Sequence, residues 1–174
     1  MRTHNGMRPQ DIVILPKIVT FPAGKAWRVM DIVASVHLSQ SEISESLNRS
    51  QLAGLLDASK KKVRRLSLME FLEHGLHYVF PQHPGALVRG IPTAHSHPFM
   101  KKKIISEDDY VWPDEAGQVR GQAIEPLAKT VTKAVKEDET LYKLLALTDV
   151  IRVGKTRELK IALQELKLMI LDGA

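Results

Sequence analysis

Residues 32–47 read Ile-Val-Ala-Ser-Val-His-Leu-Ser-Gln-Ser-Glu-Ile-Ser-Glu-Ser-Leu, and this stretch decides how we interpret the chain. It predicts a helix, a tight turn and a second helix that begins after Ser39. The Ser39 hydroxyl can accept a hydrogen bond from the backbone N–H of Glu42, and the Glu42 carboxylate can accept one from the backbone N–H of Ser39. Such a capping box satisfies donors that the first turn of a helix leaves without partners. The sequence therefore predicts a helical hairpin.

Apolar residues recur at helical spacing on both sides of the turn, so two short helices can bury facing stripes against each other. These residues are Ile32, Val33, Val36, Leu38, Ile43 and Leu47. The second helix then presents a polar face outward. That face carries Gln40, Ser41, Ser44, Glu45 and Asn48, with Arg49 at its edge. Short hydrogen-bonding side chains on an exposed helix are what reading the DNA major groove requires.

The segment resembles the helix-turn-helix of bacterial transcription regulators. Two positions depart from that pattern: His37 stands where such turns usually carry Gly, and Val33 stands where the first helix usually has Ala. Glycine suits the turn because it reaches positive φ without strain, whereas His does so less readily. The alternative is a capped helical hairpin with a purely structural role.

A basic segment follows the second helix. Two runs with β propensity, 55–57 and 62–66, surround a polar turn, which predicts a β-hairpin. Its tip and return strand carry Lys60, Lys61, Lys62, Arg64 and Arg65. Each Lys or Arg that neutralises a phosphate releases condensed counterions and adds affinity without sequence preference. The alternative is a solvated, charged loop that keeps the hairpin soluble.

A basic hairpin directly after a helix-turn-helix resembles the winged helix of MarR-like regulators, over residues 8–80. The resemblance implies that the helix over 40–53 reads bases while the hairpin, or wing, grips the DNA backbone or the minor groove. We therefore expect the polar face defined above to read bases. We expect Arg49 and the five cations of the wing to hold phosphates.

Composition agrees with an anionic partner. The 174 residues are 44% hydrophobic, which is enough for a real core, and the net charge is +5. The absence of cysteine excludes disulfides and thiolate metal sites. No apolar run is long enough to span a bilayer, and the N-terminus lacks a secretory apolar region. We expect a cytoplasmic protein without a membrane partner.

The rest of the chain divides by composition. A helix over 67–80 should close the winged helix, and Pro81 should stop it. Residues 81–136 are rich in Pro and Gly, with short β-like pieces at 86–89, 110–112 and 118–120, and should form an ordered, loop-rich layer. Two helices should follow within 137–171. The expected fold is mainly α with a small β-hairpin wing, an α+β class.

The last helix, over 155–171, is apolar over more than one stripe, which suggests burial on two sides. A homodimer interface would provide that burial and would place two reading helices about 34–36 Å apart on one face of the DNA. The alternative is an internal helical hairpin that caps the core of one chain.

The histidines of the Pro-rich loop are weak candidates for a metal site. His95 and His97 lie two apart, with His83 before them and acidic residues at 107–109. Imidazole and carboxylate can hold zinc, but no strong metal-binding spacing is present, so hydrogen-bonding histidines are the default interpretation. No positioned nucleophile or phosphate-binding Gly-rich loop points to catalysis.

The sequence thus favours a sequence-specific regulator that binds double-stranded DNA as a homodimer, without cofactor or catalytic activity. Two alternatives stay open. One is a winged-helix module that binds another protein, such as an antitoxin or adaptor. The other is a sensor in which the loop over 83–109 holds a metal or a ligand.

Overall fold

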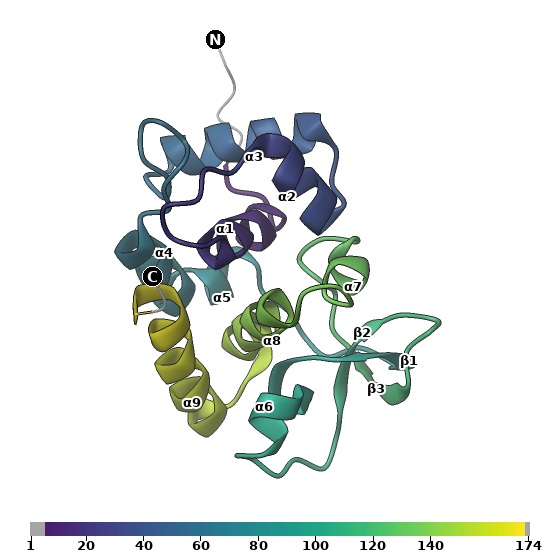
Figure 1. Ribbon diagram of the computed structural model, residues 1–174. Helices are drawn as coiled ribbons and strands as arrows, with labels where there is room; N and C mark the ends of the chain where they lie inside the picture. The colour runs from purple at the N-terminus through teal and green to yellow at the C-terminus, as the bar shows by residue number, and fades with distance from the viewer. Residues whose placement is uncertain (1–5, 173–174) are drawn as a thin grey trace.

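The structure, a computed structural model, describes residues 6–172 and combines many helices with one small sheet (Figure 1). The first part of the chain forms α1 (Asp11–Thr20), α2 (Val29–Val36), α3 (Gln40–Leu52), α4 (Arg65–His74) and α5 (Leu76–Val79). The middle part forms β1 (Leu87–Pro92), the 3-10 turn η1 (Ala94–Ser96), α6 (Pro98–Lys101), β2 (Tyr110–Pro113), β3 (Val119–Ala123) and α7 (Val131–Ala134). The chain continues through α8 (Glu139–Val153), α9 (Thr156–Lys167) and the π-helical turn η2 (Leu168–Asp172). Over residues 6–172, no helix has the length and apolar character needed to cross a membrane.

The predicted helical hairpin is present as α2 and α3. The Ser39 hydroxyl accepts a hydrogen bond of 3.2 Å from the Glu42 N–H, and the Glu42 carboxylate accepts one of 2.9 Å from the Ser39 N–H. The capping box is therefore confirmed. His37, which stands where such turns usually carry Gly, ends α2 in the left-handed region with φ 57° and ψ 31°. The turn thus has the backbone shape that Gly favours, built with a His.

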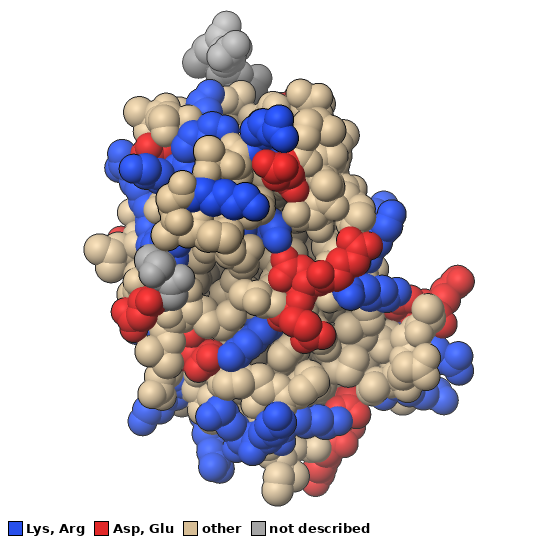
Figure 2. Space-filling view, in the orientation of Figure 1, with Lys and Arg blue, Asp and Glu red and all other residues tan. Residues whose placement is uncertain are grey.

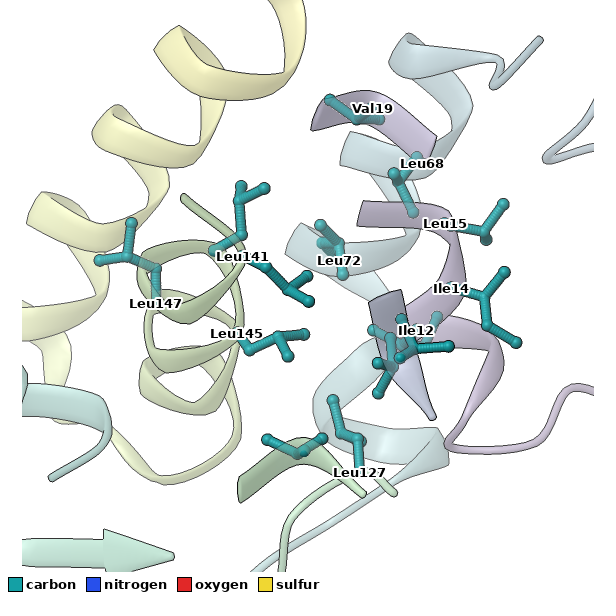
Figure 3. Close-up of a cluster of buried hydrophobic side chains, with 14 of the residues drawn as sticks. Ile12, Ile14, Leu15, Val19, Leu68, Leu72, Leu127, Leu141, Leu145 and Leu147 are labelled. Carbon is teal, nitrogen blue, oxygen red and sulfur yellow. The ribbon is translucent and has the colours of Figure 1, made fainter. Parts of the chain in front are cut away.

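The hydrophobic core surrounds α1. Ile12, Val13, Ile14 and Leu15 are completely buried, because α1 contacts α2 and α3 on some of its faces and α8 on another. Figure 3 shows side chains of α1, α4 and α8 gathered in one cluster. The buried hydrophobic side chains form one cluster, whose members come from all parts of the chain between Ile12 and Ile170. The expected segments 8–80, 81–136 and 137–171 consequently share one core.

The two expected C-terminal helices are α8 and α9, with η2 extending the second. Leu141, Leu144, Leu145 and Leu147 of α8 are buried within this chain. The last helix, α9, buries a single stripe of Glu158, Ala162 and Leu166 within this chain, while Leu159, Ile161 and Leu163 are half-buried, so the expected burial on two sides is not seen within one chain. Dimerisation through the C-terminal helices stays a prediction.

The three β-like pieces of the middle segment form one small closed sheet. Strand β1 is antiparallel to both β2 and β3, and a short parallel pairing of β2 with β3 closes it. The closure requires Gly90, because a Cβ on that residue would lie 2.0 Å from the backbone oxygen of Trp112. The middle segment is therefore ordered around this sheet, with short helical turns and loops between and beside its strands.

The expected β-hairpin wing is much reduced, and this corrects the sequence prediction. The two runs meet only in a single bridge between Leu56 and Val63. The second run cannot continue as a strand because α4 already begins at Arg65. The sheet of this protein lies in the middle segment, and the segment over 55–64 is a tight loop, which we call the basic loop.

Candidate nucleic-acid interface

The outer face of α3 is the predicted reading face. Gln40, Ser41, Ser44, Glu45 and Asn48 are all exposed, and we call these five residues the polar face. On the opposite side, Ile43, Ser46, Leu47 and Ser50 are buried. In Figure 1, α3 runs along the edge of the molecule farthest from α6 and α9. The helix thus buries one stripe against its own chain and leaves the other open to a partner.

Two contacts determine which way α3 faces, and a third determines where it begins. Ile43 and Leu47 anchor its apolar stripe in the core. Arg49 reaches back to Asp11 of α1, with its Nε 3.0 Å from Oδ2 and its Nη2 2.7 Å from Oδ1 of that carboxylate. The capping box begins the helix at Ser39, and its hydrogen bonds hold the pKa of Glu42 below its usual value. Rotation of α3 would expose its apolar stripe and break the ion pair with Asp11 together.

Asp57 organises the basic loop. Its carboxylate accepts hydrogen bonds from the backbone N–H groups of Lys61 and Lys62, both at 3.0 Å, and from the Ser59 hydroxyl at 2.7 Å. These bonds, with the hydrogen bond from Ser59 the strongest influence, lower the pKa of Asp57. Lys60 enters the left-handed region with φ 60° to close the turn. The loop is therefore an ordered structure despite its charge.

The six cations predicted to hold phosphates divide into two with no side-chain partner among residues 6–172 and four that contact other groups of the chain. Lys62 and Arg64 are exposed, and their side chains have no hydrogen-bond or ion-pair partner among residues 6–172. Lys60 donates to Asn48 Oδ1 of the polar face, which ties the basic loop to α3. Lys61 lies with its Nζ 4.3 Å from the ring centre of Trp27 and 3.2 Å from the backbone oxygen of that residue.

The other two predicted phosphate ligands, Arg49 and Arg65, connect α3 and α4 to other elements of the fold. Arg49 is almost buried in its pair with Asp11. Arg65 belongs to the first turn of α4, and its Nη1 donates a 2.6 Å hydrogen bond to the backbone oxygen of Ile170 in η2. We therefore leave both residues out of the contacts proposed below.

Sequence reasoning missed residues that the fold brings to this region. Lys25 and Trp27, from the linker between α1 and α2, share a pocket lining with Lys61 and Lys62. No local pattern signals this, because the two segments are separated by all of α2 and α3. In Figure 2, Lys and Arg gather at the upper left, over the basic loop and the adjoining end of α3. A second group lies at the bottom of the view.

The candidate metal residues lie elsewhere and do not form a site. His95 and His97 are both buried. His95 Nε2 is 2.6 Å from the backbone oxygen of Asp108, and His97 Nδ1 accepts a hydrogen bond from the Phe99 N–H. The Asp109 carboxylate pairs with Lys101 at 2.8 Å. Among the residues described, no three His, Asp or Glu side chains are grouped so that they could hold a metal ion.

Comparison with protein-family models, with curated proteins and with solved structures finds no match for this chain. The functional argument therefore rests on the geometry of α3 and the basic loop.

Proposed function

We propose that this protein binds double-stranded DNA by placing the polar face of α3 in the major groove, as helix-turn-helix regulators do. The observation that carries the proposal is the exposure of all five polar-face side chains on a helix that is held from behind by the core and by Asp11. Hydroxyl, amide and carboxylate groups are the side-chain groups that distinguish base edges there. The basic loop acts as a short wing beside the groove.

The wing contacts are assigned to Lys62 and Arg64, since both are exposed and no acidic side chain pairs with them among residues 6–172. Lys60 connects the two parts, because it holds Asn48 in the absence of DNA. When DNA binds, the Lys60 ammonium can exchange its hydrogen bond with Asn48 for one with a phosphate, which frees the Asn48 amide to contact a base. The regulator acts at a promoter by occlusion or positioning, and it does so as a homodimer.

Selection of bound sequences from a random pool of duplexes tests base reading and dimerisation together. We expect an enriched consensus with two inverted half-sites whose centres are about 34–36 Å apart. An enriched consensus without inverted repeats would contradict the dimer alone. Failure to retain any duplex, at low salt as well, would contradict DNA binding and favour the protein-binding alternative.

Variants separate the two kinds of contact. Asn48→Ala should reduce discrimination at one base position by roughly 1–3 kcal/mol. Replacing both Lys62 and Arg64 by Ala should weaken matched and scrambled duplexes alike and reduce the slope of log K against log salt by about 2. The matched control replaces Lys102 and Arg120, which are also exposed but lie far from α3 in the fold, and should leave the slope unchanged. Equal effects of the two double variants would remove the basic loop from the interface.

A further inference from the structure

A pocket of about 540 Å³ lies between the linker that joins α1 to α2 and the end of the basic loop. Ile18 and Val19 of α1 contribute apolar surface to it. Phe21 and Trp27 add two stacked rings, with centres 6.0 Å apart and planes inclined by 22°. This volume falls within the range of small-molecule sites, which are about 300–1,000 Å³.

The charge around this apolar pocket has one sign. Lys25, Lys61, Lys62 and Arg65 line it, and no Asp or Glu is among its lining residues. Asp57, itself part of the basic loop, does not line the pocket; it accepts hydrogen bonds from backbone N–H groups of the loop, and its pKa is lowered most by the hydrogen bond from Ser59, with the nearby Lys62 charge as a smaller contribution. Lys61 donates a hydrogen bond to the backbone oxygen of Trp27, and Arg65 donates one to that of Ile170. The side chains of Lys25 and Lys62 have no hydrogen-bond or ion-pair partner among residues 6–172. The site therefore offers two uncommitted positive charges beside an aromatic surface.

We propose that this pocket binds a small organic anion with a flat apolar body. The body packs against the half-buried Phe21 and the small part of Trp27 that stays exposed, where its burial is favourable, and the anionic group pairs with Lys62 and Lys25. A neutral apolar ligand would leave the charges unpaired. An inorganic anion would leave the rings unused.

The pocket also gives the ligand a route to DNA binding, and this part rests on the function proposed above. Lys62 both lines the pocket and belongs to the assigned wing contacts. A ligand that pairs with Lys62 withdraws one phosphate contact and adds a negative charge beside the others. Occupancy of the pocket should therefore weaken binding to duplex DNA.

The probe for the test is 8-anilinonaphthalene-1-sulfonate, a fluorescent aromatic anion, used with the full-length folded protein. Its neutral relative N-phenyl-1-naphthylamine has the same ring system without the sulfonate. We expect saturable binding of the anion at one site per chain, at least about tenfold tighter than that of the neutral compound, because a hydrogen bond to a charged group contributes this much. The melting temperature should rise with the concentration of the anion, which excludes binding to unfolded chains.

Variants locate the site. Lys62→Gln and Lys25→Gln should each weaken binding of the anion severalfold and leave the neutral compound unaffected, whereas Lys102→Gln should change neither. Equal affinity for both compounds, or an unchanged affinity in both pocket variants, would overturn the proposal.

A competition experiment tests the coupling. In the presence of a saturating concentration of the anion, the duplex should be bound at least threefold more weakly, and this effect should be lost in Lys62→Gln. Binding of duplex that is insensitive to a bound anion would overturn the coupling while the proposed function stands. Binding of the anion by a protein that retains no duplex would overturn the proposed function and the coupling while the pocket assignment stands.

Discussion

Arg49 and Asp11 form a two-pronged ion pair that joins α3 to the first turn of α1. The carboxylate is fully buried and the guanidinium nearly so, and the closest approach is 2.7 Å. Asp11 also accepts a hydrogen bond from the Arg8 N–H at 2.8 Å, which ties the segment before α1 to the first residue of that helix. Its hydrogen bonds to Arg49 raise the pKa of that guanidinium. One carboxylate thus holds the start of α1 and the rotation of α3.

Removal of Asp11 should be strongly destabilising. Asp11→Ala leaves the nearly buried Arg49 guanidinium with only the exposed Glu45 carboxylate, 3.9 Å from its Nη1, and we expect a loss of about 3–5 kcal/mol in the free energy of unfolding, measured by urea denaturation. The variant that replaces both residues by Ala should lose much less than the sum of the single variants. Arg120→Ala, at an exposed position, is the control and should cost less than about 0.5 kcal/mol. Additive losses would contradict a direct coupling between the two side chains.

The cap of α3 can be tested on its own. Ser39→Ala removes the acceptor for the Glu42 N–H and should cost about 1 kcal/mol, while Ser39→Gly should cost only a few tenths. Ser41→Ala, in the first turn of the same helix but without a capping bond, serves as the comparison. Thermal or urea unfolding of the three variants measures the differences. A loss in Ser41→Ala as large as that in Ser39→Ala would argue against the capping role.

The backbone conformation of His37 should determine how substitutions at this position change the stability of the protein. At φ 57° any residue with a Cβ is strained, so His37→Gly should be about 1 kcal/mol more stable than His37→Ala. Within the preceding helix Ala should instead be more stable than Gly, so Ala34→Gly should cost about 1 kcal/mol in the free energy of unfolding. Equilibrium unfolding of these variants gives the comparison. A His37→Ala protein as stable as His37→Gly would mean that the turn relaxes out of the left-handed region.

His97 should make the stability depend on pH. Burial, with some repulsion from Lys143, lowers its pKa to about 4 from an ordinary value of 6.5. The unfolded chain takes up a proton at this residue below pH 6.5, while the folded chain does not until about pH 4. Because the unfolded state alone is protonated in that interval, stability should fall by up to about 1.4 kcal/mol per pH unit as the pH decreases.

The matched variant for this prediction is His97→Asn, which keeps an acceptor for the Phe99 N–H and removes the titrating ring. Its stability should decline less steeply between pH 6.5 and pH 4 than that of the unchanged protein, as measured by urea unfolding at several pH values. Parallel curves for the two proteins would show that His97 titrates at its ordinary value in the folded state.

Local patterns predicted the features that involve residues close together in the chain. The capping box at Ser39 depends on a spacing of three residues, and the outward polar face depends on the period of one helix. The strands of the middle segment were also recognisable as short extended pieces. The basic segment after α3 was recognised, but its hairpin was overestimated because the early start of α4 at Arg65 could not be seen locally.

The sequence by itself determined a capped amphipathic helix with a polar outer face, since the apolar and polar positions of one helix are set by its period. Only the tertiary structure decided which charges remain free. Asp11 engages Arg49, Trp27 engages Lys61, and the η2 turn engages Arg65, each across more than thirty residues. The physical reason is that a long cationic side chain takes the partner that the fold brings within reach, and those partners come from segments that sequence spacing does not relate.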